Sequence, residues 1–347
     1  MKIVHCGDFH FNRPFSGLDS ARMAALRREE QREAFKKIAY MAKDSDCLLI
    51  AGDLFDNPKP DFTLTAYLAD CLKKVPRVFI SPGNHDPHTL YEQLTFPENV
   101  HVFKGETECV DCGEFAVWGN CGCEIGDIKP DGSKINLLCI HADVNGTADY
   151  NSITENELVS YGFDYVALGH IHKYSGIKRV GRTRFAYCGA PFAGGFDETG
   201  DKGVICAEIT KEGTTGEFKT IDNRRFREEV IILDNAKGYS DIVPQRPVEG
   251  DFYKITVKGT VSPEFLFRAD ILRDRIASDY YYLRIKDETT VHIPYEKLSE
   301  EYSLKGIFVR KMLERINREP DNDRLKKALD IGVRVLEGKK SEDMLCE

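Results

Sequence analysis

Hydrophobic residues along the chain gather in five short runs, and a cluster of Asp, His, Asn or Gly follows each run. The runs are Ile3–Cys6, Leu48–Ala51, Val78–Ile80, Leu137–Ile140 and Tyr165–Leu168. Short apolar runs that end near glycines are typical of buried strands followed by sharp turns. The pattern therefore predicts five strands, each with polar side chains just beyond its carboxyl end.

Two longer segments between the first of these runs have the composition and spacing of helices. Ala21–Lys43 is rich in Ala, Arg, Glu, Gln and Lys, and Asp19 or Ser20 stands before it as a candidate cap. In Phe62–Lys74, leucines recur four residues apart. Strands that alternate with helices indicate an α/β fold.

After residue 172 the pattern changes to strands joined by glycine-rich turns, and the chain then divides again. The strands predicted there are Phe185–Cys188, Gly203–Ile209 and Glu229–Leu233. The composition of Pro244–Gly250 indicates a hinge. We therefore predict a first domain over residues 1–243.

Two further parts are predicted beyond the hinge. A strand–helix–strand module over residues 251–294 is built from Tyr253–Val257, Pro263–Ile276 and Tyr280–Ile285. Residues 295–347 contain two amphipathic helices, Ser303–Arg318 and Asp321–Leu336, separated at Pro320.

Composition narrows the class of protein. The 347 residues are 41% hydrophobic, which is enough for a large core. The formal net charge of −9 argues against a protein that coats nucleic acid non-specifically, although it leaves room for a nuclease with a local basic path. No apolar run reaches the ~18 residues of a membrane span, and the N-terminus lacks the features of a signal peptide. We therefore expect a cytoplasmic protein without a membrane segment.

The eleven cysteines are expected to be reduced thiols, because no secretory signal precedes them. Four of them, Cys109, Cys112, Cys121 and Cys123, form a CxxC followed by a CxC. This spacing could form a zinc site, but buried or half-buried thiols that alternate along strands are the favoured interpretation. Both interpretations stay open.

The polar clusters after the five runs contain the side chains that divalent metals bind in proteins. In α/β sheets, sites gather beyond the carboxyl ends of the strands, so five such clusters predict one shared site. Asp8 and His10 stand two residues apart, as do His170 and His172, and in an extended stretch both members of such a pair point to one side. The remaining candidate ligands are Asp53, whose two oxygens could bridge two ions, Asn84, with a neutral carbonyl oxygen, and His141.

The ordered set DxH, GDxxD, GNHD, an isolated His and GHxH resembles that of the calcineurin-like metallophosphoesterases, over about the first 200 residues. The resemblance implies a four-layer α/β/β/α sandwich. It also implies one metal held by Asp8, His10, Asp53 and His172, and a second held by Asp53, Asn84, His141 and His170. His85 would act beside the leaving-group oxygen as general acid or charge stabiliser, and Asp56 would orient it.

Secondary motifs resemble those of the SbcD/YhaO-type DNA repair nucleases. They are Gly52–Asp56 followed by Pro58 and Pro60, Tyr187–Phe192, Gly195–Glu198, and Lys202–Gly203. The resemblance implies a DNA exonuclease or endonuclease whose small α/β module is a capping domain and whose helical tail docks a partner. Some relatives have His at the position of Asp56. The Asp in this chain departs from the pattern of those relatives and matches the general phosphoesterase pattern.

The same resemblance implies cofactors and partners. The cofactors would be two divalent ions, with manganese implied and iron or zinc also accepted by such ligands. The partners would be DNA, an SMC-like ATPase of the SbcC type and a second copy of the chain. The apolar face of the first tail helix, with Leu304, Ile307, Phe308 and Leu313, could dock the ATPase, or the helix could pack on its own domain.

Substrate contacts are harder to predict. His88 lies just past the GNHD turn, and Arg179, Arg182 and Arg184 follow GHxH. The arginines could grip phosphates, or they could belong to a solvated hairpin. The alternative functions are a phosphoesterase for small nucleotides or phosphomonoesters, which needs the same metals but no DNA path, and a scaffold that has lost catalysis.

Overall fold

A computed structural model describes residues 1–59, 61–146, 151–262, 264–265 and 267–338 of the chain. Pro60 and Pro263, which entered the predictions above, lie outside the described residues. The chain divides into two compact units. The first contains residues 1–229, 247–254 and 276–284, and the second contains residues 230–246, 255–275 and 285–347.

Two six-stranded sheets form the centre of the first unit. The strand order of the first sheet is β14 (Thr214–Thr220), β13 (Gly203–Ile209), β1 (Lys2–Cys6), β2 (Cys47–Ala51), β3 (Val78–Ser81) and β4 (Val100–Val102). The order of the second is β11 (Lys178–Val180), β12 (Thr183–Tyr187), β10 (Tyr165–Gly169), β7 (Ile135–His141), β6 (Phe115–Gly119) and β5 (Glu108–Asp111). All five strands predicted from the apolar runs are present.

Parallel pairing brings the ends of these strands together. In the first sheet, β1, β2, β3 and β4 pair in parallel, while β13 and β14 are antiparallel additions at one side. In the second sheet, β6, β7, β10 and β12 pair in parallel. The polar clusters after β1, β2 and β3 therefore meet at one edge, as do those after β7 and β10.

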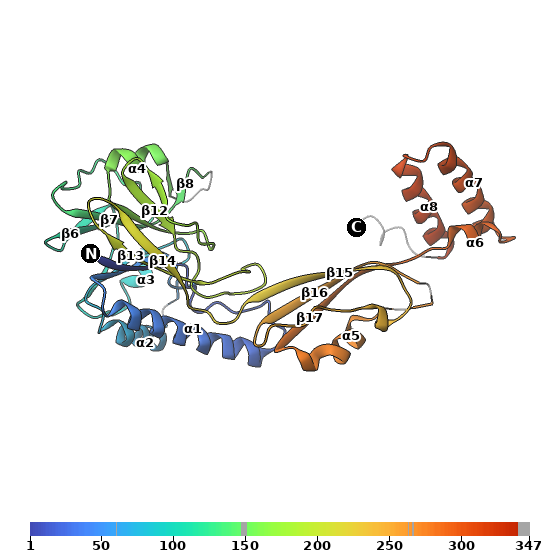
Figure 1. The fold of residues 1–347 in the computed structure, drawn as a ribbon, viewed down its shortest axis with the longest axis horizontal. Coiled ribbons are helices and arrows are strands. Elements are labelled where there is room, and N and C mark those ends of the chain that lie inside the picture. The colour runs from blue at the N-terminus through green and yellow to red at the C-terminus, as the bar shows by residue number, and fades with distance from the viewer. Residues whose placement is uncertain (60, 147–150, 263, 266, 339–347) are drawn as a thin grey trace. The chain divides into compact units, whose positions relative to one another are not determined.

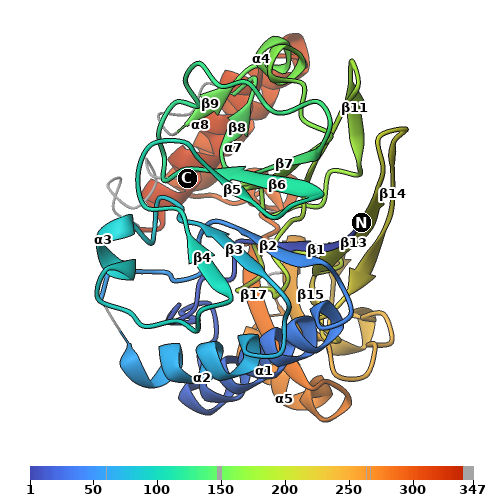
Figure 2. The same ribbon diagram turned by 90° about the vertical axis from the view of Figure 1, so that its left-hand side faces the viewer.

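The sheets pack face to face, and helices cover the two outer faces, so the first unit has four layers (Figures 1 and 2). The helices α1 (Ala21–Ala42) and α2 (Phe62–Leu72) cover the first sheet. The helix α4 (Glu155–Tyr161) covers the second, and α3 (His88–Tyr91) and the short pair β8 (Asp143–Val144) and β9 (Ser152–Ile153) lie in connections. The predicted α/β/β/α sandwich is confirmed.

Alternation along the strands explains the layers. On β1, Val4 and Cys6 pack into the core beneath α1 and α2, whereas Ile3 packs into the core between the sheets. On β7, Leu137 and Cys139 face the core between the sheets, and Leu138 and Ile140 face the core beneath α4. Adjacent residues of a strand thus pack into different cores, because side chains alternate across a strand. This is why the runs are continuously apolar.

The cap of α1 is decided by geometry. The Ser20 hydroxyl accepts a hydrogen bond from the backbone N–H of Met23, so Ser20, and not Asp19, is the N-cap. Asp19 instead accepts a 2.7 Å hydrogen bond from the hydroxyl of Tyr282.

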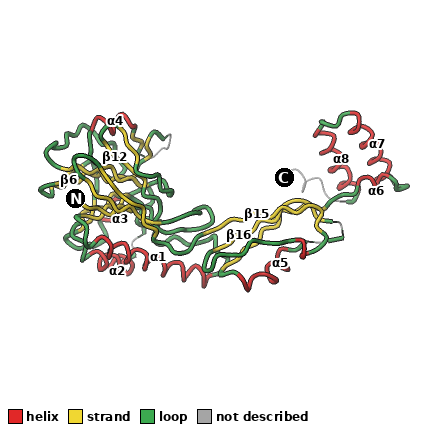
Figure 3. The backbone as a smooth tube through the Cα atoms, viewed as in Figure 1, coloured by secondary structure: helices red, strands yellow, loops and turns green. Residues whose placement is uncertain are grey.

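A third sheet has the strand order β15 (Phe226–Ala236), β16 (Phe252–Val261) and β17 (Tyr282–Val291). The 3₁₀ turn η1 (Tyr239–Asp241) follows β15, and the helix α5 (Ala269–Ile276) and the turn η2 (Ala277–Asp279) connect β16 to β17. The strand–helix–strand order after the hinge is as predicted. Figure 3 distinguishes these strands from the helices of the tail.

The tail in the second unit consists of α6 (Tyr295–Ser299), α7 (Leu304–Arg318) and α8 (Asp323–Leu336). Its own apolar core contains Leu298, Val309, Met312, Leu329 and Val333. The predicted docking face on α7 is corrected in part. Leu304 and Ile307 are exposed, whereas Phe308 and Leu313 pack against this core. No helix within the described ranges is long and apolar enough to span a bilayer.

Candidate metal centre

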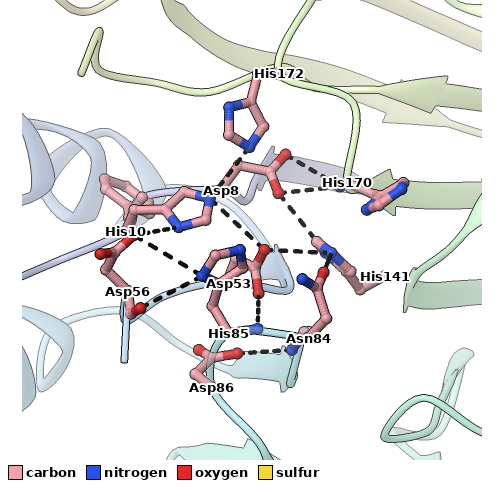
Figure 4. A network of polar contacts seen from close by, with 12 residues as sticks. Asp8, His10, Asp53, Asp56, Asn84, His85, Asp86, His141, His170 and His172 are labelled. Carbon is pink, nitrogen blue, oxygen red and sulfur yellow. Dashed lines mark hydrogen bonds and ion pairs between the residues drawn. The ribbon is translucent and has the colours of Figure 1, made fainter. Parts of the chain in front are cut away.

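The predicted ligands lie in turns that follow β1, β2, β3 and β10, and at the end of β7 (Figure 4). Backbone hydrogen bonds tie the first two turns together. The N–H of Asp8 donates to the Gly52 carbonyl, and the N–H of His10 donates to the Asp53 carbonyl, each at 2.9 Å. Two loops more than 40 residues apart in the chain are thus held in register.

Three groups of acidic and imidazole side chains converge there. Within each group, one ligand atom from every member lies within 4.8 Å of the others. The groups are Asp8–His10–His172, His10–Asp53–His85 and Asp8–Asp53–His141. Hard oxygen and imidazole nitrogen donors in such density suit a divalent transition-metal ion.

Oxygen atoms orient three of the imidazoles through their Nδ1 atoms. His10 Nδ1 lies 3.1 Å from Asp56 Oδ1, and His172 Nδ1 lies 2.8 Å from Glu198 Oε1. His141 Nδ1 lies 3.3 Å from a backbone carbonyl oxygen on β2. Carboxylate and carbonyl oxygens only accept, so each Nδ1 carries the proton and each Nε2 offers a lone pair.

Two of these lone pairs face one another. His10 Nε2 and His172 Nε2 lie 3.1 Å apart, and Asp8 belongs to the same group. Two neutral imidazoles with protonated Nδ1 atoms would repel at this distance unless a cation, either a proton or a metal ion, joins them. The residues therefore fit a bound metal ion.

Asp53 lies between the two halves of the cluster. Its Oδ2 atom is 3.6 Å from His10 Nε2 and 3.4 Å from His141 Nε2. His141 Nε2 also lies 3.0 Å from Asn84 Oδ1. One oxygen of the Asp53 carboxylate thus lies between the imidazoles of His10 and His141.

His170 has a different position from the other predicted ligands. It belongs to none of the three groups, although its ring lies against that of His141, with 5.1 Å between centroids. Its backbone N–H donates to both carboxylate oxygens of Asp8, at 3.0 and 3.2 Å. Burial and the neighbouring His141 lower the pKa of His170.

The backbone at the cluster is strained, and one premise of the sequence interpretation is wrong. An extended stretch was the reason to expect Asp8 and His10 on one side, but their φ angles are +52° and +51°. Asp53 and His170 also have positive φ, at +47° and +96°. Residues other than glycine rarely adopt this region, and such strain gathers at functional sites.

His85, the predicted general acid, lies at the rim of the cluster. Its side chain is 45% exposed, and its backbone N–H donates to Asp53 Oδ1 at 2.9 Å. Asp56 Oδ1 lies 3.9 Å from His85 Nδ1 but 3.1 Å from His10 Nδ1. The carboxylate predicted to orient His85 therefore has a closer partner in His10.

Asp86 stabilises the Gly83–Asp86 turn through hydrogen bonds. Its carboxylate accepts from the N–H groups of Gly83 and Phe55 and from the Tyr91 hydroxyl, at 2.7, 3.1 and 2.6 Å. Burial, with the neighbouring charge of Asp53, raises the pKa of Asp86 to about 6.

Glu198 belongs to the Gly195–Glu198 motif, for which no role was predicted, and its Oε1 lies 2.8 Å from His172 Nδ1. Burial opposes its ionisation, but His172 and Arg13 hold the pKa of Glu198 well below its ordinary value. Burial also opposes the charged form of His172, but Glu198 and Asp8 outweigh it and raise the pKa of His172. Only a fold that joins residues 172 and 198 reveals this pair, so spacing alone could not assign it.

The predicted phosphate-gripping arginines are not brought to the cluster. The β10–β12 register pairs Arg184 with Tyr165, at the end of β10 opposite to His170. Arg179 and Arg182 donate to the backbone carbonyls of Gly181 and Gly162. They belong to the β11–β12 hairpin, at the end of β12 away from the metal cluster.

Two other sets of candidates also lie apart from the metal groups. His88 begins α3, and it is in none of the three groups. None of those groups, within the described part of the chain, contains a cysteine. Cys109 is exposed, and Cys112, Cys121 and Cys123 are half-buried.

Comparison with known proteins gives a family and several relatives. The family model for calcineurin-like phosphoesterases matches residues 1–174. An uncharacterized metallophosphoesterase, YhaO of Bacillus subtilis, is 24% identical, over 83% of this chain and 82% of its own. The DNA double-strand break repair protein Mre11 of Methanopyrus kandleri is 23% identical, over 76% and 66%. The SbcD component of the Bacillus subtilis nuclease SbcCD is 25% identical, over 64% and 69%.

Proposed function

The chain belongs to the calcineurin-like phosphoesterase family, and on that premise we propose that it is a two-metal phosphodiesterase that hydrolyses the DNA backbone. The observation that carries the metal part is the pair of imidazole Nε2 atoms, of His10 and His172, that face one another at 3.1 Å. The nuclease part is supported by relatives named as a DNA break repair protein and as a nuclease component.

The proposed ligands divide into two sets that share Asp53. The first ion would be held by Asp8, His10, Asp53 and His172, and the second by Asp53, Asn84, His141 and His170. When bound, such ions act as Lewis acids toward a phosphate and lower the pKa of water. The Asp53 carboxylate supports this division, because its Oδ2 faces an imidazole of each set.

The chain supplies the remaining chemistry through His85 and Asp56. His85 would assist the departing sugar oxygen, and its position beside the cluster and the exposure of its ring to solvent support this role. The bond from its backbone to Asp53 fixes the base of the side chain, and the backbone carbonyl of Asp56 lies 3.4 Å from its Nδ1.

The proposal extends to cofactor and partners. Manganese is the metal we propose, in a nuclease domain over residues 1–243, with a capping module over 251–294. The C-terminal part, residues 295–347, would dock an SMC-like ATPase of the SbcC type, and the exposure of Leu304 and Ile307 on α7 supports this. A second copy of the chain is a further proposed partner.

The alternative is a phosphoesterase for small nucleotides or phosphomonoesters, with the same ligands. Exposure of His85 at the rim favours neither class. Because the overall charge is −9, DNA binding would depend on local basic side chains and on the bound metal ions.

The test compares end-labelled linear duplex DNA with small mono- and diesters, in Mn²⁺, with and without a coiled-coil ATPase from the same organism. We expect duplex cleavage that EDTA abolishes and Mn²⁺ restores. Asp53→Asn should abolish it, whereas His101→Gln, at an imidazole on β4 that pairs with Glu108, should act like wild type. Release of phosphate from small esters with no DNA cleavage under any of these conditions would refute the nuclease proposal.

A further inference from the structure

A buried carboxylate stands behind the candidate metal ligand His172. Glu198 is 7% exposed, and its Oε1 accepts from His172 Nδ1 at 2.8 Å and from Arg13 Nη1 at 2.6 Å. Its Oε2 accepts from the backbone N–H of Gly194 at 2.8 Å. All three partners are donors, so an ionised carboxylate satisfies each of them, whereas an amide would turn a donor toward a donor.

This arrangement is built for a close fit. A Cβ on Gly194 would lie 2.0 Å from Arg13 Nη1, so a larger residue there would displace the guanidinium from its present position. The backbone of His172 is also held, because Lys202 Nζ donates to its carbonyl at 3.0 Å and the N–H of Ala190 donates to it at 3.2 Å. The ring and the backbone of His172 are therefore held by separate groups.

We infer that Glu198, held by Arg13, is a positioning residue that sets the tautomer and the ring orientation of His172 for metal binding. The inference deepens the proposed function and rests on its assignment of His172 as a ligand. By keeping the proton on Nδ1, Glu198 leaves the Nε2 lone pair directed at the group formed with Asp8 and His10. Outer-shell carboxylates of this kind change metal affinity by about 10–100-fold when removed.

Asp197 provides a matched control beside it. Its carboxylate also faces Arg13, at 3.5 Å, but its side chain is 71% exposed. A purely electrostatic or salt-bridge role for Arg13 would involve both acids, whereas a positioning role involves Glu198 alone.

The experiment measures Mn²⁺ binding to the full chain by the electron paramagnetic resonance signal of the free ion, after EDTA treatment. The metal alone is the probe, so no DNA activity is required. We expect Glu198→Ala to weaken binding at one of two sites by about 10–100-fold and Glu198→Gln to weaken it less. Asp197→Asn should bind as wild type does. Urea unfolding of the metal-free proteins shows whether a variant is folded, so weaker metal binding can be distinguished from unfolding. If Glu198→Ala does not fold, Glu198→Gln, whose side chain is close in size, tests the positioning role.

Two results would overturn the inference. One is wild-type Mn²⁺ affinity in the folded Glu198 variants, and the other is an equal loss in Asp197→Asn. His172→Ala distinguishes this failure from failure of the proposed function. If His172→Ala binds two ions with wild-type affinity, the ligand assignment itself is wrong. If it loses affinity while the Glu198 variants do not, only the positioning role falls.

Discussion

Gly83 is the first residue of the GNHD turn. Adding a single methyl group there should strongly disturb the candidate metal centre. A Cβ at Gly83 would lie 2.1 Å from Asp53 Oδ1, 2.6 Å from the Asp53 backbone nitrogen and 2.7 Å from its Cγ. Real Cβ contacts are essentially never shorter than 3.0 Å, so Gly83→Ala must change the separation of the turn and the Asp53 carboxylate by about 0.9 Å or more. Active-site groups need placement within about 0.5 Å, and a 1 Å error costs about 10²-fold in rate.

The assay is hydrolysis of a small phosphodiester in Mn²⁺, together with Mn²⁺ binding. We expect Gly83→Ala to lose about 10²-fold in kcat/KM and to bind the metal more weakly. Backbone strain is not the cause, because Gly83 lies outside the left-handed region.

Gly132→Ala is the control, since its Cβ would meet nothing within 4 Å and its φ is ordinary. Activity and metal affinity of Gly83→Ala equal to those of Gly132→Ala would refute the claim that Asp53 must stay where this turn leaves it.

Three further predictions concern chemistry and stability. His85→Ala should lower kcat by about 10²–10⁴-fold while Mn²⁺ binding persists, and unchanged kcat would remove its assigned role. Burial lowers the pKa of His5 to about 3, so the unfolded chain binds more protons between about pH 6.5 and 3 and stability falls as the pH falls there. Between pH 7 and 5, the free energy of unfolding measured in urea should therefore fall by about 2 kcal/mol less in His5→Gln than in wild type. Parallel pH profiles of the two proteins would contradict this. Leu68→Ala, at a fully buried position of α2, should cost about 2–5 kcal/mol in the same assay. Phe62→Ala, exposed on the same helix, should cost less than about 0.5 kcal/mol, and equal costs would contradict the burial argument.

The apolar runs predicted the central strands well because burial on both faces leaves a continuous signal. On β2, each of the five residues from Cys47 to Ala51 is buried, and they alternate between two cores. The peripheral strands gave no such signal. On β5, Glu108–Asp111, no residue is buried, so periodicity could not separate it from a loop.

For the site, the order of the motifs sufficed to nominate the ligands, but their geometry did not follow from spacing. Asp8 and His10 converge through left-handed backbone angles, which an extended stretch would not supply. The arginines after GHxH are near His170 in sequence but distant from it in the fold. The parallel strand β12 begins beside Tyr165, at the end of β10 away from His170.

The amino-acid sequence by itself determined the alternation of strands and helices and the chemical types of the candidate ligands. Both are local, since burial periodicity and donor atoms belong to single residues and their neighbours. Only the tertiary structure decided which nitrogen of each imidazole faces the cluster, because that choice depends on partners such as Glu198 for His172 and Asp56 for His10. A proton's position on a ring is fixed by whatever oxygen the fold brings beside it, and a linear sequence does not specify that neighbour.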